Sequence, residues 1–391
     1  MTEIIETDVL IVGGGPAGLA VSETLTGVDS ILVHQDKEIG KPVRTSGGSW
    51  LHDMQRLQIP EHLYQRIDQL DVYSDTREVV VDICDAPAVV LDVTRLYQWQ
   101  AARAHSEIFC ATKFLRTRKF EDGYLSTVRT AGEGEWQIRS QKIVDASGWH
   151  CAVLESLGMG ARPARDATGI EYEYPVQGAQ MHRAVLFFGA FALTGYGWAF
   201  PTNYGTMRLG VGVIRPDSDA SPKDMMAALL ASNQLERMGI PRPDGQHINA
   251  GTIPSVAYER QLVYGDVIRV GDSANMATPT LGEGIRICIE QGYLLGEALS
   301  VGTPKALRLW ERQATRRFAL NYRVGFWINK AAARYTVRNW ERSLKRMERM
   351  PGHELVAYFR SEFTPGMLLR RVCLLLWRKM VDGFRRDTGK K

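Results

Sequence analysis

A run of glycines directly after an apolar segment constrains this chain more than any other feature of its sequence. The segment TDVLIVGG is typical of a buried parallel strand, and Gly13, Gly15 and Gly18 follow with GxGxxG spacing. The first glycine permits a tight turn, the second lets the backbone approach a pyrophosphate, and the third lets helix and strand pack closely. With a helix expected over 16–25 and a second strand over 30–34, the pattern predicts a βαβ unit that binds a dinucleotide.

The end of the second expected strand lacks the usual residue of such a site. An acidic side chain about 20 residues after the glycines normally binds the ribose hydroxyls. Here that place holds His34-Gln35-Asp36. Three interpretations stay open: His34 hydrogen-bonds the ribose in place of the acid, Asp36 reaches back to it, or both are surface residues beyond the strand.

Two later segments indicate which dinucleotide is bound. Both run from an apolar strand into a turn, and the shorter one, 143–148, contains Asp145. The longer segment is 270–285. In it, a carboxylate at 272 can accept a hydrogen bond from a ribityl hydroxyl, and a glycine turn before a helix brings N–H groups near a flavin ring. Three such motifs in this order predict FAD. The candidate cofactor contacts of the longer segment are Gly271, Asp272, Pro279, Gly282, Gly284 and Ile285.

The three motifs resemble those of the p-hydroxybenzoate-hydroxylase-type FAD enzymes, a superfamily of aromatic hydroxylases, flavin-dependent halogenases and geranylgeranyl reductases. The resemblance covers about residues 5–330. It implies an α/β (α+β) fold, in which a Rossmann-like FAD-binding domain carries an inserted antiparallel β-sheet substrate domain and precedes a helical C-terminal region. It also implies that Arg44 and Arg95 contact FAD, the alternative being ordinary surface arginines. NAD(P)H or another reductant would be the electron donor.

The order of strand and helix patterns divides the chain into six segments. Residues 76–91 are expected to form two strands that pair around a turn at 85–87. The expected segments are FAD-binding parts at 1–75, 106–160 and 261–303, a linking segment at 76–105, a β-sheet substrate domain at 161–260 and a helical, basic C-terminal region at 304–391.

An aromatic segment on an expected strand indicates one branch of the superfamily. Residues 196–201, YGWAFP, followed by a GxG at 210–212, are similar to the signature of the geranylgeranyl reductase branch. Because side chains alternate along a strand, Tyr196, Trp198 and Phe200 share one face. This face either lines an apolar substrate cavity beside the flavin or belongs to the core.

Hydroxyl residues occupy a position where several members of that branch carry a cysteine. Those reductases have a Pro-x-x-Cys-Gly-type turn near the flavin, and this chain has Thr45 and Ser46 there. A hydroxyl can position a substrate or water, but it lacks the acidity of a thiol. Ser46, as a proton donor, and Trp198 are therefore the candidate catalytic residues.

Three functions remain open at this stage. The preferred one is an FAD-dependent reductase that transfers hydride from reduced flavin to a carbon–carbon double bond of an apolar, for example prenylated, substrate. The second is a flavin-dependent monooxygenase or halogenase acting on a secondary-metabolite scaffold. No Lys or Arg follows 145–148 as in NADPH-using hydroxylases, and 197–201 keeps only one tryptophan and the proline of the halogenase segment Trp-x-Trp-x-Ile-Pro. The third is a structural or isomerising role for FAD.

The distribution of charge singles out the C-terminal region. The whole chain has a net charge of +4, but residues 301–391 carry 22 Lys and Arg against 7 Asp and Glu, a net of +15, and the first 300 residues have a net of −11. On a helix, the apolar and basic residues of 367–391 either lie on an anionic membrane surface or pack on the protein with a solvated basic face. No motif predicts binding of nucleic acid.

The remaining composition excludes several classes of protein. Five scattered cysteines without a CxxC pair, and eight histidines without ligand spacing, predict neither a disulfide framework nor a metal site. The acidic N-terminus is unlike a signal peptide, and no apolar run reaches the ~18 residues of a membrane span. We expect a cytoplasmic protein, either free or peripheral at the inner face of the membrane.

Overall fold

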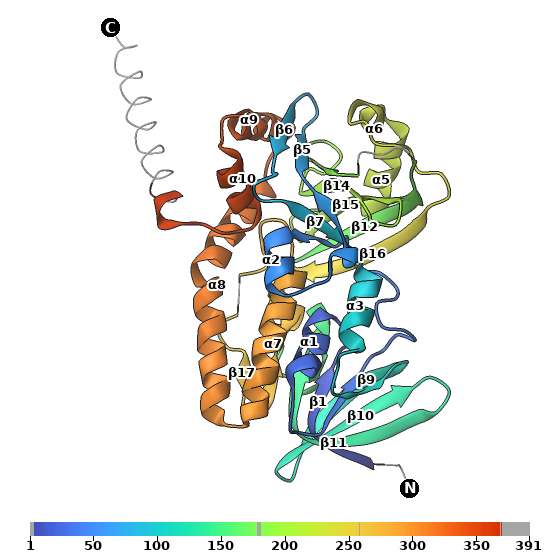
Figure 1. Cartoon of the computed structure of the whole chain (residues 1–391), viewed down its shortest axis with the longest axis vertical. Coiled ribbons are helices and arrows are strands. Elements are labelled where there is room, and N and C mark those ends of the chain that lie inside the picture. The colour runs from blue at the N-terminus through green and yellow to red at the C-terminus, as the bar shows by residue number, and fades with distance from the viewer. Residues whose placement is uncertain (1–3, 178–180, 258, 368, 370–391) are drawn as a thin grey trace.

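The computed structural model describes residues 4–177, 181–257, 259–367 and 369. They form two halves, each built on one large β-sheet, and the long helix α8 (Pro304–Ala332) runs beside both halves (Figure 1). One half contains the glycine turn, and the other contains the aromatic segment 196–201.

The eight-stranded sheet of the first half brings the three sequence motifs to one edge. β1 (Ile4–Val12) pairs in parallel with β2 (Ser30–Val33) and β11 (Gly134–Asp145), and β11 pairs in parallel with β18 (Val267–Arg269). The motifs at 13, 145 and 271 follow the carboxyl ends of β1, β11 and β18, so they meet where doubly wound sheets bind ligands. The other strands are β8 (Glu107–Phe109), β9 (Thr112–Phe120), β10 (Gly123–Thr130) and β17 (Val263–Tyr264).

Helices cover this sheet through close backbone contacts. α1 (Pro16–Thr24) and α7 (Ile285–Val301) approach so closely that a Cβ atom added at Gly292 would lie 2.6 Å from the carbonyl oxygen of Ala17. Trp310 of α8 is buried in the same core. α3 (Val93–Ala101) lies within the segment 76–105, and the short α4 (Ala152–Ser156) follows β11.

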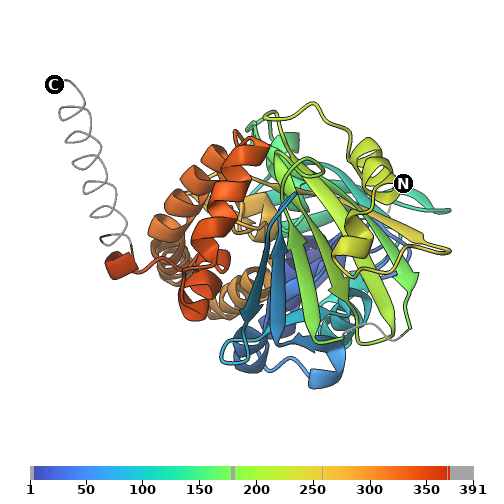
Figure 2. The ribbon, with the colours of Figure 1, turned by 90° about the horizontal axis from the view of Figure 1, so that it is seen from above.

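The seven-stranded sheet of the second half lies between two groups of helices (Figure 2). α9 (Val337–Met347) and α10 (Gly352–Phe359) pack on one face, and α5 (Pro222–Ala231) and α6 (Gln234–Arg237) pack on the other. The strands, in sheet order, are β16 (His247–Pro254), β12 (Asp166–Pro175), β15 (Thr206–Arg215), β14 (Gly195–Pro201), β13 (Arg183–Phe187), β5 (Gln69–Tyr73) and β6 (Glu78–Asp82).

A three-stranded sheet between the halves corrects the hairpin expected over 76–91. Two strands do form there, but β6 pairs with β5, whereas β7 (Ala88–Leu91) pairs with β3 (Gly48–Trp50) and β4 (Tyr64–Ile67). Both strands are short and rich in valine, so local pattern does not reveal their partners. The remaining short elements are α2 (Leu51–Arg56) and 3₁₀ turns at Glu61–Leu63, Gly148–His150 and Gly271–Ala274.

The predicted fold class is confirmed: a Rossmann-like sheet, a separate antiparallel sheet and C-terminal helices. The seven-stranded sheet is antiparallel except where β5 pairs in parallel with β13, and β5 lies before the boundary expected at residue 75. Among the described residues, no helix has the length and hydropathy needed to span a bilayer. The segment 367–391, expected to be amphipathic, lies almost entirely outside the described residues.

Candidate functional site

A cavity of about 520 Å³ opens at the edge where the three motifs meet, and Gly13, Gly15 and His34 are among the residues that line it. A Cβ atom added at Gly13 would lie 2.2 Å from the carbonyl oxygen of Ala146, and one at Gly18 would lie 2.0 Å from that of Gly13. These two glycines therefore permit the turn and its packing. No atom lies within 4 Å of a Cβ added at Gly15, so this backbone faces open space in which a pyrophosphate fits.

The end of β2 brings both His34 and Asp36 to the cavity lining. The ring of His34 lies against the glycine turn, 2.9 Å from a Cβ added at Gly14. Its Nε2 atom is buried and has no hydrogen-bond partner among the described residues, and burial lowers its pKa, which keeps the ring neutral. Asp36 also lines the cavity, but its carboxylate accepts two hydrogen bonds from Arg44, at 2.7 and 3.0 Å. A ribose hydroxyl would satisfy the buried imidazole nitrogen.

The third motif places a carboxylate and a glycine turn at the cavity wall. Asp272 lies in the 3₁₀ turn after β18, and burial raises its pKa to about 6. Gly282, Gly284 and Ile285 line the same cavity, and α7 begins at Ile285, so its N-terminus points a positive partial charge toward the cavity. These residues fit a flavin and its ribityl chain.

Three other predicted contacts lie away from the lining of this cavity. Asp145 is fully buried, and it accepts hydrogen bonds from Ser147 Oγ at 2.6 Å and from the Val153 backbone N–H at 3.2 Å, so it holds the turn behind the wall. Arg95 is mostly exposed on α3 and lies 3.5 Å from Asp92. Pro279 lines a different cavity.

That second cavity, of about 200 Å³, lies between the seven-stranded sheet and helices α8, α9 and α10. Its lining is mostly apolar and includes Ile328, Trp340 and Phe359 of these helices. A third, smaller cavity of about 90 Å³ adjoins it. Thr45 and Gly282 line all three cavities. The two apolar cavities therefore meet the first cavity, called the cofactor cavity below, beside the glycine turn at 282–284, called the flavin-side turn below.

The predicted aromatic wall divides between the two apolar cavities. Tyr196 and Trp198 line the larger one, with ring centroids 5.6 Å apart, whereas Phe200 lines the smaller one. Tyr196 borders both and donates a hydrogen bond to the carbonyl oxygen of Leu281 at 2.6 Å. Ser46 also lines both cavities.

The GxG signature has a direct steric role beneath Trp198. A Cβ atom added at Gly210 would lie 2.1 Å from Trp198 Cζ2, and one added at Gly169 would lie 3.1 Å from the same ring. At Gly212 the corresponding distance is 3.5 Å, an ordinary contact. The glycines therefore provide the flat surface on which the indole lies.

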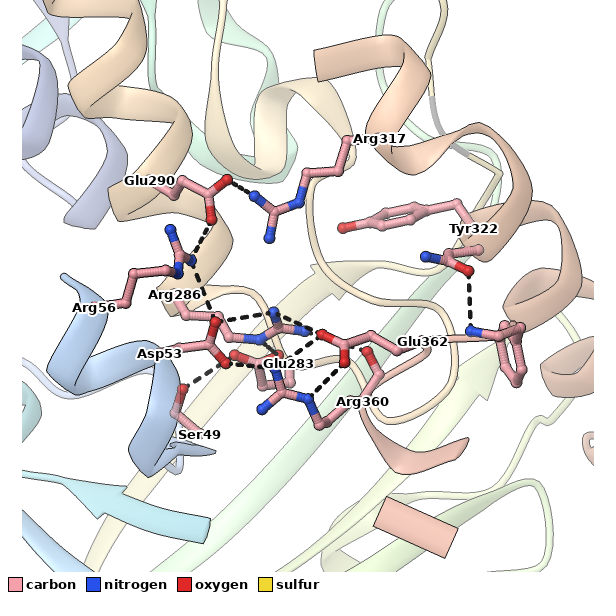
Figure 3. A network of polar contacts seen from close by, with 12 residues as sticks. Ser49, Asp53, Arg56, Glu283, Arg286, Glu290, Arg317, Tyr322, Arg360 and Glu362 are labelled. Atoms are coloured by element: carbon pink, nitrogen blue, oxygen red, sulfur yellow. Dashed lines mark hydrogen bonds and ion pairs between the residues drawn. The ribbon is translucent and has the colours of Figure 1, made fainter. Parts of the chain in front are cut away.

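A buried ionic network supports the flavin-side turn from behind (Figure 3). Arg286 donates to Glu283 at 2.7 Å and lies 3.6 Å from Asp53, and Arg360 lies 2.9 Å from Asp53 and 2.8 Å from Glu362. Burial raises the pKa of Glu283. Burial also acts to raise the pKa of Asp53, but Arg286 and Arg360 outweigh it and lower that pKa. The network joins α2, α7 and the segment after α10.

Sequence reasoning missed several residues of these sites. Tyr97 and Trp149 line the cofactor cavity from α3 and from the turn after β11, and Glu171 and Asn249 line the larger apolar cavity. None belongs to a short motif, because each reaches its cavity through the packing of distant elements. The one available signal was the position of Trp149 directly after 145–148.

The fold and these joined cavities are those of an FAD-dependent oxidoreductase. A model of the FAD binding domain family matches residues 66–304, and the chain belongs to that family.

Individual relatives agree with this placement. The chain is 27% identical over 311 residues to digeranylgeranylglycerophospholipid reductase 3 of Methanosphaera stadtmanae, covering 75% of this chain and 77% of the relative. It is 27% identical over 330 residues to digeranylgeranylglycerophospholipid reductase 1 of Methanothermobacter thermautotrophicus, covering 79% of this chain and 81% of the relative. A geranylgeranyl bacteriochlorophyll reductase-like structure from Thermoplasma acidophilum matches with a TM-score of 0.78 and 17% identity, over 89% of this chain and 93% of that chain.

Proposed function

We propose that this protein reduces a carbon–carbon double bond in a prenyl chain of a lipid-like substrate. The observation that carries the proposal is the meeting of an apolar cavity with the cofactor cavity at Thr45 and Gly282. The names of the relatives, digeranylgeranylglycerophospholipid reductases, support the same substrate class. When bound and reduced, FAD supplies a hydride to an acceptor held beside its ring.

The chain's own residues bind and orient the prenyl chain. Tyr196 and Trp198 offer flat apolar surfaces on the sheet side, and Trp340 and Phe359 close the cavity from the helix side. Burying each methylene of a prenyl chain is worth about 0.8 kcal/mol. The same residues exclude water from the double bond, and Thr45 borders both this cavity and the cofactor cavity.

An anaerobic assay tests this function. Protein loaded with FAD is reduced chemically, mixed with a lipid bearing geranylgeranyl chains, and followed by flavin absorbance and by mass spectrometry of the lipid. We expect the flavin to be reoxidised without oxygen while the lipid gains two hydrogens for each double bond reduced. Absence of reoxidation, together with insertion of oxygen or halide into an acceptor once air is admitted, would instead support the monooxygenase or halogenase function.

We further propose that the protein contacts an anionic membrane surface to reach this substrate. The exposed face of α8 carries Leu309, Leu320 and Trp327, with exposed fractions of 53%, 47% and 65%. Exposed arginines alternate with them, including Arg316 and Arg323. The one acidic residue of α8 is Glu311, whose carboxylate accepts hydrogen bonds from the backbone of residues 262 and 263. Apolar anchors among uncompensated cations are typical of interfacial helices.

A further inference from the structure

A buried carboxyl group faces the larger apolar cavity from the middle of the sheet. Glu171, on β12, is 3% exposed. Among the described residues that line this cavity it is the only carboxyl group. Trp198 Nε1 donates a hydrogen bond to its Oε2 atom at 2.7 Å, and Asn249 Nδ2 donates to Oε1 at 3.1 Å. Because Trp198 also lines the cavity, the carboxyl group lies next to the surface on which a prenyl chain would rest.

Burial raises the pKa of Glu171, although a guanidinium lies nearby. One guanidinium, Arg208, serves two carboxyl groups, and its Nε atom lies 3.2 Å from Glu173 but 3.9 Å from Glu171. Burial acts to raise the pKa of Glu173, yet Arg208 outweighs burial and lowers it, so this pair is ionised. Burial raises the pKa of Glu171, and the attraction of Arg208 does not overcome it. The site therefore holds a carboxyl group whose pKa lies above the usual value for glutamate, beside an ion pair between Arg208 and Glu173.

The same cluster is tied to the junction of the cavities. Arg208 Nη1 donates hydrogen bonds to the carbonyl oxygens of Ser46, at 2.9 Å, and Leu91, at 3.1 Å. Ser46 is adjacent to Thr45, which lines all three cavities. The position of the acid is thus coupled to the loop that borders both substrate and cofactor. Carboxyl groups are far stronger acids than the hydroxyl of Ser46, the donor proposed from sequence.

We propose that the Glu171 carboxyl group is the acid that protonates the substrate in this reduction, an inference that rests on the proposed function. The π bond of the alkene is broken, one carbon forms a C–H bond with the hydride supplied by reduced flavin, and the neighbouring carbon forms a C–H bond with the proton of Glu171. The alkene is reduced and the flavin oxidised. Glu171 then recovers a proton from water.

Existing hydrogen bonds prepare the site for this transfer. The carboxylate left behind accepts hydrogen bonds from Trp198 and Asn249, which already point at its two oxygens, and it gains attraction from Arg208. No reorganisation of these donors is needed as charge develops. The other titratable groups that contact Glu171 or line its cavity are Arg44, Glu173, Tyr196, Arg208, Tyr335 and Tyr358.

The test compares Glu171→Gln with Glu173→Gln in the FAD-loaded protein. Both variants remove one carboxyl group beside Arg208, but only residue 171 lines the cavity. In the anaerobic assay we expect Glu171→Gln to slow oxidation of the reduced flavin by the prenyl lipid at least about 100-fold, the usual scale of general acid catalysis. Glu173→Gln keeps the acid but frees Arg208 to pair with it, so this variant should keep the rate of the parent at low pH and lose it at a lower pH than the parent does. Both variants should bind FAD and lipid like the parent protein.

An infrared measurement provides a readout apart from activity. As the pH is raised, the carbonyl band of a protonated carboxylic acid should persist in the parent above the range of ordinary glutamates and be missing from Glu171→Gln. In Glu173→Gln, where Arg208 is free to pair with Glu171, the band should disappear at a lower pH than in the parent. If Glu171→Gln fails to fold, Trp198→Phe decides the question. Its loss of a donor to the carboxylate should shift the decline of the rate with rising pH to higher pH.

The outcomes separate the two proposals. Equal rates in Glu171→Gln and Glu173→Gln at low pH, or an unshifted pH profile in Trp198→Phe, would overturn the role of Glu171 and leave the reductase function standing. A parent protein that is not reoxidised by the prenyl lipid would overturn the function, and the role of Glu171 as its acid with it.

Discussion

Asp272 couples cofactor binding to pH at the scale of a single residue. Its carboxyl group faces the cofactor cavity, where burial raises its pKa to about 6. A ribityl hydroxyl that donates to this group prefers the ionised form, so the proton must leave before the bond is made. Affinity for FAD should therefore rise as pH increases through about 6, and it should fall by up to tenfold for each unit below it.

Titration of the apoprotein with FAD, followed by flavin fluorescence between about pH 5 and 7, measures this dependence. Asp272→Asn should bind FAD with an affinity that is flat over the same range. An unchanged slope in the variant would assign the dependence to another group.

Gly210 and Gly212 form a matched pair for testing whether the glycines beneath Trp198 support its indole ring. A methyl group at 210 would lie 2.1 Å from Trp198 Cζ2, whereas one at 212 would lie 3.5 Å from Trp198 Cζ3. Gly210→Ala should displace the indole, destabilise the protein by about 1–3 kcal/mol and weaken lipid binding. Gly212→Ala should change both far less. Denaturant unfolding and lipid titration measure the two effects, and equal behaviour of the variants would contradict the packing argument.

At the scale of elements, Arg286 joins α7 to α2 and to the segment after α10. Its guanidinium is 3% exposed and lies between Glu283 and Asp53. Arg286→Ala would leave the buried Glu283 without its ion-pair partner and would remove one of the cations around Asp53, which keeps Arg360. We expect a loss of about 3–5 kcal/mol in unfolding free energy, with release of FAD because Glu283 belongs to the flavin-side turn.

Arg316→Ala, on the exposed face of α8, is the control and should change the unfolding free energy by no more than about 0.5 kcal/mol. Denaturant unfolding and the flavin content of purified protein report both effects. A stable Arg286→Ala variant that keeps its FAD would show that the network does not hold the turn.

At the scale of the whole molecule, α8 runs beside both halves (Figure 1). Its exposed side chains include Arg316 and Arg323. The double variant Arg316→Glu and Arg323→Glu reverses both charges and touches neither cavity lining. We expect it to weaken binding to vesicles containing anionic phospholipid, with a loss in binding free energy of about 1 kcal/mol for each cation removed.

Vesicle cosedimentation at several salt concentrations measures this binding. Neutral phosphatidylcholine vesicles are the control, since neither protein should depend on charge for binding to them. Equal binding of the parent and the double variant to anionic vesicles would place any membrane contact elsewhere on the protein.

The glycine turn of the cofactor cavity could be predicted from sequence patterns, whereas the cluster around Glu171 could not. The glycine turn could be predicted because its requirements are local: Gly13 must adopt a positive φ of 116°, and Gly18 must let α1 approach the turn. The alternation of Tyr196 and Trp198 was equally local. The pairing of the strands within 76–91 was predicted wrongly, since their partners come from elsewhere in the chain.

The acid cluster and the ionic network could not be predicted in this way. Glu171, Trp198 and Arg208 come from three strands that become neighbours only when β12, β14 and β15 pair in register. Whether Glu171 keeps its proton depends on burial and on which carboxyl group Arg208 approaches more closely. Both are properties of the assembled sheet.

The sequence by itself therefore determined where this protein turns around a dinucleotide, that the dinucleotide is FAD, and which strand carries an aromatic face. Steric limits on backbone and side-chain alternation act over a few residues, so a short pattern records them. Only the tertiary structure decided that the apolar cavity meets the cofactor cavity at Thr45 and Gly282, and that Glu171 faces it. The desolvation of a charge and the distance to its partner exist only once distant segments are packed together.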